Sequence, residues 1–324
     1  MKEKKETYRP MVSVCCIVYN QELFLRDCFD GFVAQKTNFP IEILIHDDAS
    51  NDGTTEIINE YTEKHPNLFK PIIQVQNQYS KGLGLIGLKL NIKRAKGKYI
   101  AFCEGDDYWT DPLKLQKQVD FLEKHEEYGF VGSYCFIDNN GSRVEEKSNI
   151  PFVEEDRDFR LCGDVFSDAK WGPVTRTCTL LCRKSLIDGY ADDVLGDIVL
   201  ETVLARQSFY ACYKSFASVY RVGVGESAVQ HDYGKALRYN EYVVKNRLKQ
   251  KELFPDDCPW DEDELDDSKT YIKLKHSIEL FRYRDAMHLK KQLKTKLYKN
   301  KNYAKRMKGF FSFVLLFVMI KLKG

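Results

Sequence analysis

Residues 98–112, KYIAFCEGDDYWTDP, join an apolar run directly to a group of acids. The run at 99–103 predicts a β-strand that enters the core. Three carboxylates, Glu104, Asp106 and Asp107, follow it within four positions. Aspartates are common in solvated turns, so the Asp-Asp pair alone indicates an ordinary turn. Its meaning depends on what the neighbouring strands carry at their ends.

Apolar runs and helical patterns alternate through the residues before this stretch. Residues 12–19 (VSVCCIVY) and 41–46 (IEILIH) predict strands that are covered on both faces. Helical spacing of apolar residues follows at 21–35 and at 54–64. A third strand is predicted at 72–76, with a further helix before the strand already described. Such alternation with short connections predicts a parallel α/β sheet.

Three of the predicted strands end in polar side chains. In parallel α/β sheets, ligands bind at the carboxyl ends of the strands, so three such ends at one edge indicate a binding site. Paired aspartates suit a hard cation such as Mg²⁺ or Mn²⁺, which takes few protein carboxylates and completes its shell with water and phosphate oxygens. This pattern points to a nucleotide diphosphate. The three polar ends are Tyr19-Asn20, Asp47-Asp48 and Asp106-Asp107.

Composition narrows the class of protein. The chain has 324 residues, of which 43% are hydrophobic and 13% aromatic, as expected of a globular protein. A net charge of +2 gives no reason to expect a nucleic-acid partner. The ten cysteines include no CxxC pair, and the charged N-terminus has no apolar signal region. We therefore expect a cytoplasmic protein with free, mostly structural thiols.

The chain divides into regions of different character. An amphipathic helix is predicted at 112–124, less regular structure follows to about residue 193, and strands are predicted at 177–182 and 215–222. Beyond residue 231 the sequence is highly charged and helical. The predicted regions are an α/β domain at 1–232, with halves 10–125 and 126–232, a charged helical region at 233–308 and an apolar tail at 309–324.

Three segments carry a resemblance to a known family: VSVCCIVYNQE, IEILIHDDASNDGT and AKGKYIAFCEGDDYWTDPLKLQKQ. Together they resemble the N-terminal half of family 2 glycosyltransferases, which are inverting, nucleotide-sugar-dependent enzymes with the GT-A fold. The resemblance covers residues 11 to about 125, and NQYSKG at 77–82 belongs to it. The third segment looks like a bacterial subgroup. The resemblance implies a GT-A α/β fold with a mostly parallel sheet.

The resemblance also implies roles at the first two strand ends. Tyr19 would stack on the base of the nucleotide, which suits an aromatic ring at the end of a strand. Asp48 would accept a hydrogen bond from an imide NH, which favours uracil or thymine. Asn20 and Glu22 belong to the same expected nucleotide-sugar site.

At the third strand end, the resemblance implies that Asp106 holds the ribose and that Asp107 binds Mn²⁺ or Mg²⁺ between the phosphates. The metal would offset the charge that develops on the departing nucleoside diphosphate. The chain departs from the family where many members carry an Arg-Asn pair, because Leu88-Lys89 stands there. Lys89, Lys93 and Arg94 are open alternatives for a phosphate contact.

An inverting transferase needs a base that takes the proton of the acceptor hydroxyl. Asp197 is our candidate, because GDIVL at 196–200 resembles the G-D-x-x-L segment of the family. The alternative is a helix N-cap, for which Asp is well suited, and both roles can hold together. Tyr220-Arg221 resembles the Y-R motif of the family, but Gly223 stands where many members have a His. We expect His231 to be a surface residue.

The expected reaction is transfer of a hexose or N-acetylhexosamine from a nucleotide diphosphate sugar, UDP-linked, to a glycan or lipid-linked glycan, as in cell-surface polysaccharide synthesis. One alternative is a sugar nucleotidyltransferase, which should carry a Gly-rich loop after the first strand; VYNQELF has no Gly. The other alternative is an inactive glycan-binding or scaffold protein on the same fold.

The C-terminal tail predicts contact with a membrane. Residues 310–320 (FFSFVLLFVMI) are apolar but too few to span a bilayer, and residues 290–308 before them carry nine Lys or Arg and no acid. Apolar residues flanked by cations suit a segment that lies on anionic lipid, here at the inner face of the cell membrane. The alternative is a helix packed on protein.

Overall fold

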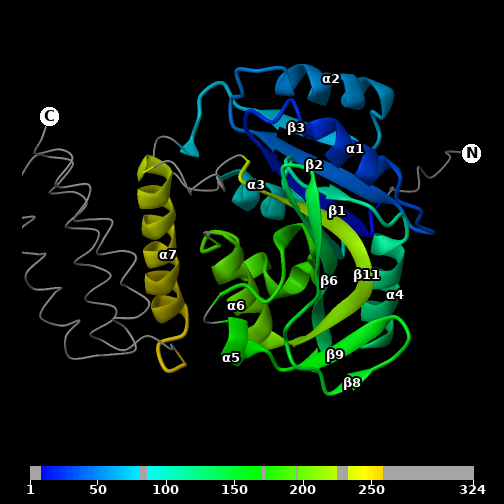
Figure 1. Ribbon diagram of the computed structural model, residues 1–324, viewed down its shortest axis with the longest axis vertical. Helices are drawn as coiled ribbons and strands as arrows, with labels where there is room; N and C mark the ends of the chain where they lie inside the picture. The colour runs from blue at the N-terminus through cyan, green and yellow to red at the C-terminus, as the bar shows by residue number, and fades with distance from the viewer. Residues whose placement is uncertain (1–8, 80–85, 170–171, 195, 225–232, 258–324) are drawn as a thin grey trace, which may run out of the picture. The chain divides into compact units, whose positions relative to one another are not determined.

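The computed structural model describes residues 9–79, 86–169, 172–194, 196–224 and 233–257 (Figure 1). Residues 1–259 form one compact unit, and residues 260–324 form a second unit that lies outside the described residues. The mixed α/β architecture and the largely parallel N-terminal half of the sheet confirm the predicted fold class. The predicted limits of the regions along the chain remain predictions.

Eleven strands of the described chain form one sheet in the order β3-β2-β1-β4-β10-β6-β11-β9-β8, with β5 paired to β11 and β7 paired to β6. The strands are β1 (Val12–Val18), β2 (Ile41–Asp47), β3 (Phe69–Ile73), β4 (Tyr99–Phe102), β5 (Tyr108–Trp109), β6 (Tyr128–Asn139), β7 (Ser142–Glu146), β8 (Glu154–Glu155), β9 (Phe159–Gly163), β10 (Leu181–Arg183) and β11 (Phe209–Val222).

Helices cover both faces of this sheet (Figure 1). The α-helices are α1 (Leu25–Val33), α2 (Thr54–Lys64), α3 (Ile86–Arg94), α4 (Lys114–Lys124), α5 (Phe166–Ala169), α6 (Asp197–Gln207) and α7 (Tyr233–Leu253). The short 3₁₀ helices are η2 (Thr177–Thr179), η3 (Lys184–Leu186) and η4 (Asp188–Tyr190).

The residues of β1 show why the sheet is covered on both faces. Val14 and Cys16 point into one apolar core, which also contains the buried side chains of α1, α2 and α4. Cys15 points into the other core, which contains those of α3 and α6. Successive side chains of a strand face opposite sides, so a continuous apolar run such as β1 fits a strand buried between two helical layers.

The C-terminal half of the sheet changes direction. β10 runs antiparallel between β4 and β6, whereas β6 and β11 are parallel over most of their length. The β6–β11 pairing contains register shifts, one of them between Tyr213 and Phe216. The predicted less regular region therefore contains β6, one of the longest strands of the described chain, which the sequence did not reveal.

Two predicted strands were partly wrong. The strand expected at 72–76 lies at 69–73, because β3 pairs with β2 from Phe69, which faces Ile43. Residues 177–179 form a 3₁₀ helix, not a strand. Trp109 Nε1 and Ser218 Oγ both donate hydrogen bonds to the carbonyl of Cys178, at 2.7 and 3.0 Å, so side chains take the place of a neighbouring strand there.

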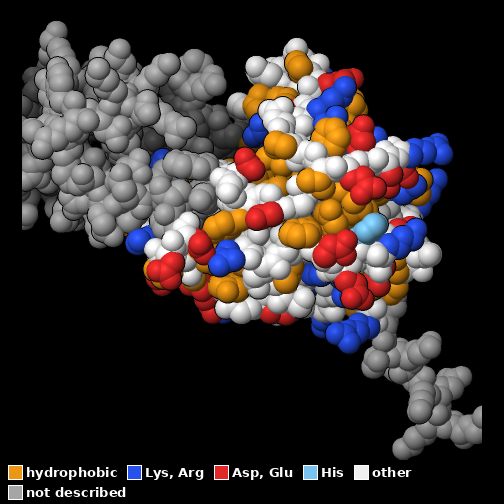
Figure 2. All heavy atoms as spheres, turned by 90° about the horizontal axis from the view of Figure 1, so that it is seen from below, with side chains coloured by type: hydrophobic (Ala, Val, Ile, Leu, Met, Phe, Trp, Pro, Cys, Tyr) orange, Lys and Arg blue, Asp and Glu red, His pale blue; other side chains and the backbone are white. Residues whose placement is uncertain are grey.

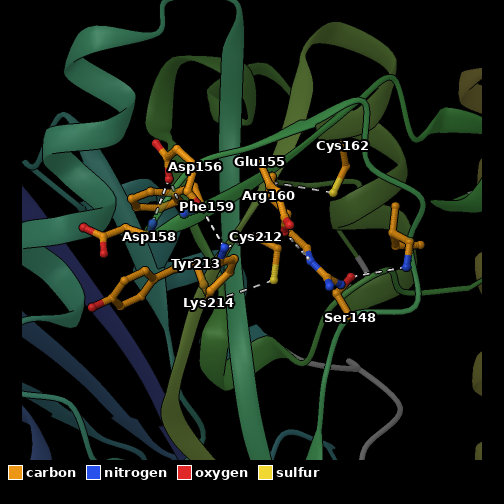
Figure 3. Close-up of polar contacts among 11 residues, drawn as sticks. Ser148, Glu155, Asp156, Asp158, Phe159, Arg160, Cys162, Cys212, Tyr213 and Lys214 are labelled. Carbon is orange, nitrogen blue, oxygen red and sulfur yellow. Dashed lines mark hydrogen bonds and ion pairs between the residues drawn. The ribbon is translucent and has the colours of Figure 1, made fainter.

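The hairpin of β8 and β9 is fixed to β11 by polar contacts (Figure 3). Asp156 accepts hydrogen bonds at Oδ1 from the backbone N–H groups of Asp158 and Phe159, both at 2.7 Å, which shapes the turn. Lys214 Nζ on β11 donates to the carbonyl of Asp156 at 2.6 Å. These contacts order the end of the sheet farthest from β3.

One face of the molecule carries mixed charges (Figure 2), and the described cysteines agree with the expectation of free thiols. On the face drawn in Figure 2, acidic and basic side chains are scattered among apolar ones without a broad patch of one charge. The nine cysteines of the described residues are all buried and unpaired, which confirms the expected free thiols for that part of the chain. Burial raises the pKa of thiols such as Cys28 and Cys178 well above the ordinary value.

Candidate active site

The three polar strand ends lie at one edge of the sheet. β1 is parallel to both β2 and β4, and Val18 at the end of β1 faces Asp47 at the end of β2. Asp48 N donates to the carbonyl of Val18 at 3.1 Å, and Gly105 N donates to the carbonyl of Ile17 at 3.2 Å. The turns after β2 and β4 therefore both start beside the end of β1, as the sequence predicted.

Tyr19 and Asn20 form the exit from β1. Asn20 has a positive φ of 51°, which turns the chain sharply away from the sheet. Its side-chain oxygen accepts a hydrogen bond from Asn51 N at 2.9 Å, and its own N–H donates to Ser50 Oγ at 2.9 Å. Asn20 thus joins the loops after β1 and β2. Tyr19 is 40% exposed, so it is partly open to solvent at this edge of the sheet.

Asp48 and Glu22 bind backbone N–H groups of nearby loops. The two oxygens of Asp48 accept hydrogen bonds from Gln78 N at 2.8 Å and Tyr79 N at 2.9 Å. Glu22 Oε2 accepts one from Gly53 N at 2.6 Å. Each carboxylate oxygen can accept a second bond, so Asp48 can hold its loop and still accept an imide NH.

The turn between β4 and β5 contains the three acids Glu104, Asp106 and Asp107. Asp107 is only 2% exposed, and its Oδ1 accepts a hydrogen bond from Arg221 N, on β11, at 2.8 Å. The guanidinium of Arg221 donates to the carbonyl of Asp106 at 2.8 Å and pairs with Asp27 of α1. Its plane also lies over the ring of Tyr108, 4.5 Å from the centroid. Arg221 therefore fixes the acidic turn through several contacts.

The acids raise one another's pKa. Burial raises the pKa of Asp107 well above its usual range, and the charges of Asp106 and Glu104 add to that effect. Burial raises the pKa of Glu104 to about 8, with further contributions from Asp106 and Asp197. Glu104 Oε2 is buried with no hydrogen-bond partner among the described residues. The turn therefore concentrates three acids in a buried place, where the ionised form of each is disfavoured.

This donor set fits a divalent cation that brings most of its own ligands. The carboxylate oxygens are hard ligands, and a cation beside them would offset their mutual repulsion. Within the described ranges, no group of three or more His, Cys, Asp or Glu side chains is arranged to hold a metal ion. A single carboxylate supplemented by phosphate oxygens and water is the arrangement that Mg²⁺ commonly accepts.

Gln21 is a site residue that the sequence argument missed. Its side chain is 8% exposed and lies on Gly105, where any Cβ would overlap the Gln21 amide oxygen. Its hydrogen bond lowers the pKa of Asp106, which opposes the larger rise caused by burial. Gln21 Oε1 itself is buried without a partner in the described chain. The only signal in the sequence was its position between Asn20 and Glu22.

Asp197 is the first residue of α6, and the N-cap position belongs to Gly196. The N-cap interpretation of Asp197 was therefore wrong. Asp197 Oδ1 accepts hydrogen bonds from Ile198 N at 2.8 Å and from the hydroxyl of Tyr242 at 2.5 Å. The charge of Asp197 contributes to the raised pKa of Glu104, so the candidate base and the acidic turn influence each other electrostatically.

The cations considered for a phosphate contact have other partners. Lys89 Nζ donates to the carbonyl of Asp192 at 2.6 Å, and Lys93 Nζ pairs with the carboxylate of the same residue at 2.5 Å. Arg94 donates to the carbonyl of Ile45 at 2.8 Å. The structure therefore supports none of the three as a phosphate ligand. His231 and the apolar tail lie outside the described residues.

Comparison with known proteins places this geometry in a family. The model of glycosyl transferase family 2 matches residues 13–189, which is more than half of the 324-residue chain. An uncharacterized protein of Mycobacterium tuberculosis (strain ATCC 25618 / H37Rv) is 50% identical over 120 residues, which are 36% of this chain and 32% of that protein. The chain is also similar to UDP-Glc:alpha-D-GlcNAc-diphosphoundecaprenol beta-1,3-glucosyltransferase WfaP of Escherichia coli, at 30% identity over 182 residues, 55% of this chain and 61% of that protein. The chain thus covers less than two thirds of the length of either relative.

Solved structures show the same fold. TarS 1-349 of S. aureus in complex with UDP-GlcNAc has a TM-score of 0.56 at 17% identity, over 82% of this chain and 72% of that one. Mannosyltransferase PcManGT from Pyrobaculum calidifontis, in complex with GDP-Man and Mn²⁺, has a TM-score of 0.51 at 15% identity, over 95% and 86%. Among the described helices, none has the length and apolar character needed to cross a membrane. From the match of the family model, which agrees with the arrangement of the strand ends, we conclude that this chain belongs to glycosyl transferase family 2.

Proposed function

We propose that the chain transfers a sugar from a UDP-linked donor to a hydroxyl group of a glycan or lipid-linked glycan, with inversion at the anomeric carbon. One observation supports the proposal: the ends of β1, β2 and β4 bring Tyr19, Asp48 and the Asp106-Asp107 turn to one edge of the sheet. The charge of Asp197 also contributes to the raised pKa of Glu104 in that turn. The relative WfaP is named as a UDP-glucose-dependent enzyme that acts on a diphosphoundecaprenol-linked sugar, which supports this class of donor and acceptor.

In this proposal the nucleotide lies along the strand ends. Tyr19 stacks on the base, Asp48 accepts its imide NH, and Asn20 and Glu22 keep the loops after β1 and β2 in place. Asp106 and the neighbouring amide of Gln21 accept and donate hydrogen bonds to the ribose hydroxyls. Uracil is favoured because it presents an imide N–H to a carboxylate acceptor, whereas cytosine has no proton there.

Asp107 would hold a Mn²⁺ or Mg²⁺ ion together with the diphosphate. When bound, such an ion would stabilise the negative charge that develops on the leaving diphosphate. The chain's own contribution is to hold the Asp107 carboxylate in a fixed position, through the hydrogen bond from Arg221 N and the burial of the turn. Burial in a medium of low dielectric constant strengthens each electrostatic interaction made there.

Asp197 would act as the base of the reaction. As the acceptor hydroxyl attacks the anomeric carbon, its proton passes to Asp197, the new C–O bond forms, and UDP leaves with the electron pair of the broken bond. Attack from the face opposite to the leaving group inverts the configuration.

The test is a panel of UDP- and GDP-linked hexoses and N-acetylhexosamines with Mn²⁺, assayed with and without an N-acetylglucosaminyl diphospholipid acceptor. We expect UDP release from at least one donor, and a glycosylated lipid of inverted anomeric configuration by NMR. Nucleotide-sugar binding without any turnover would instead favour an inactive glycan-binding protein. Product with retained configuration would contradict the role of Asp197 as a base.

A further inference from the structure

A residue of α7, the helix that follows β11, reaches the candidate base. Tyr242 lies on α7, 45 positions after Asp197, and its hydroxyl donates a hydrogen bond to Asp197 Oδ1 at 2.5 Å. The same oxygen accepts the backbone N–H of Ile198 at 2.8 Å. Among the described residues, no hydrogen bond to Oδ2 is found. One carboxylate oxygen is therefore occupied by two donors, while the other is left for a substrate.

We propose that Tyr242 is a positioning residue for the base: it fixes the Asp197 carboxylate through Oδ1, so that Oδ2 takes the proton of the acceptor hydroxyl. The inference rests on the proposed function. Tyr242 does not itself touch the reacting atoms. Its hydroxyl holds one oxygen of the carboxylate and so orients the other, and a base must be positioned in this way before it can take a proton.

Contacts near the C-terminal end of α7 hold it to α6 and to the residues before α6, so Tyr242 is supported independently of Asp197. Gln250 Nε2 donates to Thr202 Oγ1 on α6 at 2.8 Å, and this contact is buried. Lys249 pairs with Asp193, just before α6, at 3.1 Å. A residue whose neighbours on the same helix are fixed in this way loses little additional entropy when it makes its own hydrogen bond.

Gly196 provides a second, independent sign of the contact. A Cβ at position 196 would overlap the hydroxyl and ring atoms of Tyr242. Gly196, which precedes the candidate base in the GDIVL segment, therefore makes room for Tyr242 because it has no side chain. A methyl group there would push the tyrosine away from Asp197.

The experiment compares Tyr242→Phe with the parental chain, using release of UDP from UDP-glucose and UDP-N-acetylglucosamine with Mn²⁺ and the lipid-linked acceptor. We expect kcat to fall by about 10–100-fold, because a base that is held less firmly is less often in the reactive geometry. The KM for the donor should stay within about twofold, since the bond acts on the base and not on nucleotide binding.

Tyr61→Phe is the matched control, because Tyr61 also donates its hydroxyl to an aspartate, Asp30, at 2.5 Å, but between α1 and α2. Gly196→Ala should reproduce the effect of Tyr242→Phe and add little to it in the double variant, since both remove the same contact. A Tyr242→Phe variant whose kcat equals that of Tyr61→Phe would overturn the inference alone. A parental chain that releases no UDP from either donor, or from the wider panel, would contradict the proposed function and this inference with it.

Discussion

Single side chains decide the chemistry of this site, and Asp197 is the one whose role changes most between sequence and structure. It is not the N-cap of α6, because Gly196 holds that position and no side-chain cap bond is made. The replacement Asp197→Asn keeps the shape of the side chain but removes the basic oxygen. We expect kcat to fall by about 10²–10⁴-fold with little change in the donor KM.

Steady-state kinetics of the transfer reaction measure that change. Asp192→Asn is a suitable control, because Asp192 is an exposed acid near the start of α6 that pairs with Lys93. It should keep nearly the parental kcat. An Asp197→Asn variant that transfers sugar as fast as this control would mean that another group takes the proton.

Lys114 is a buried cation whose pKa predicts a pH effect on stability. Burial lowers its pKa to about 8; its Nζ lies over the ring of Trp109 and donates to Gln118 Oε1 at 2.9 Å. Between pH 8 and 10 the unfolded chain keeps this proton while the folded chain releases it, so this lysine's contribution to stability rises with pH.

Urea unfolding of the parent and of Lys114→Met tests this effect. The difference in free energy of unfolding, variant minus parent, should fall by about 2 kcal/mol as pH rises from 8 to 10. Taking the difference between the two proteins removes the opposing effect of the buried thiols, which both share. A difference that stays constant across this range would show that Lys114 keeps an ordinary pKa.

At the scale of elements, Arg183 on β10 joins three parts of the fold. Its guanidinium donates to the carbonyls of Leu122 and His125, at the end of α4, at 2.5 and 3.1 Å, and its Nε donates to the carbonyl of Tyr128 at 2.9 Å. Lysine cannot reproduce this fork of donors. We expect Arg183→Lys to lower the free energy of unfolding by about 1–3 kcal/mol.

Lys184→Met gives a control at the next position, where the side chain forms an ion pair with the half-exposed Asp188. An exposed pair of this kind contributes about 0–1 kcal/mol. Urea unfolding should therefore separate the two variants clearly. Equal losses of stability would contradict the claim that Arg183 holds β10, α4 and β6 together.

The elements also show what the sequence could predict. The pattern at 54–64 gave α2 with its exact bounds, because apolar residues at helical spacing are local information. β6 was missed because Gly129 and Gly132 interrupt its apolar run. Both glycines are there for contacts with distant residues: a Cβ at 129 would overlap Ser208, and one at 132 would overlap Thr175 and Tyr210. The sequence around each glycine does not show these distant contacts, so it could not predict the strand.

At the candidate site, too, the sequence predicted local features but not contacts between residues far apart in the chain. Tyr19, Asp48 and the Asp106-Asp107 turn were found because strands of one parallel sheet end at one edge. The contact between Arg221 and Asp107 joins residues 114 positions apart, and no local pattern predicts it. The same is true of the bond between Tyr242 and Asp197, which joins two helices.

At the scale of the whole molecule, the sequence predicts a membrane contact by the tail, which lies outside the described residues. Truncation after residue 300 should release the protein from anionic vesicles, because it removes the apolar run and part of the basic run. Co-sedimentation measures this, and high salt should weaken binding of the intact chain by screening its electrostatic part. Equal binding with and without the tail would favour the alternative of a tail packed on protein.

The central claim is that a nucleotide diphosphate binds at the strand ends through a divalent cation held by Asp107. Calorimetric titration with UDP, with and without Mn²⁺, tests it most directly, on the parent and on Asp107→Asn. We expect Mn²⁺ to tighten UDP binding to the parent by at least about tenfold, which is 1.4 kcal/mol, and to leave the affinity of Asp107→Asn unchanged. Parental UDP affinity that does not respond to Mn²⁺, or an Asp107→Asn variant that responds as the parent does, would contradict the account.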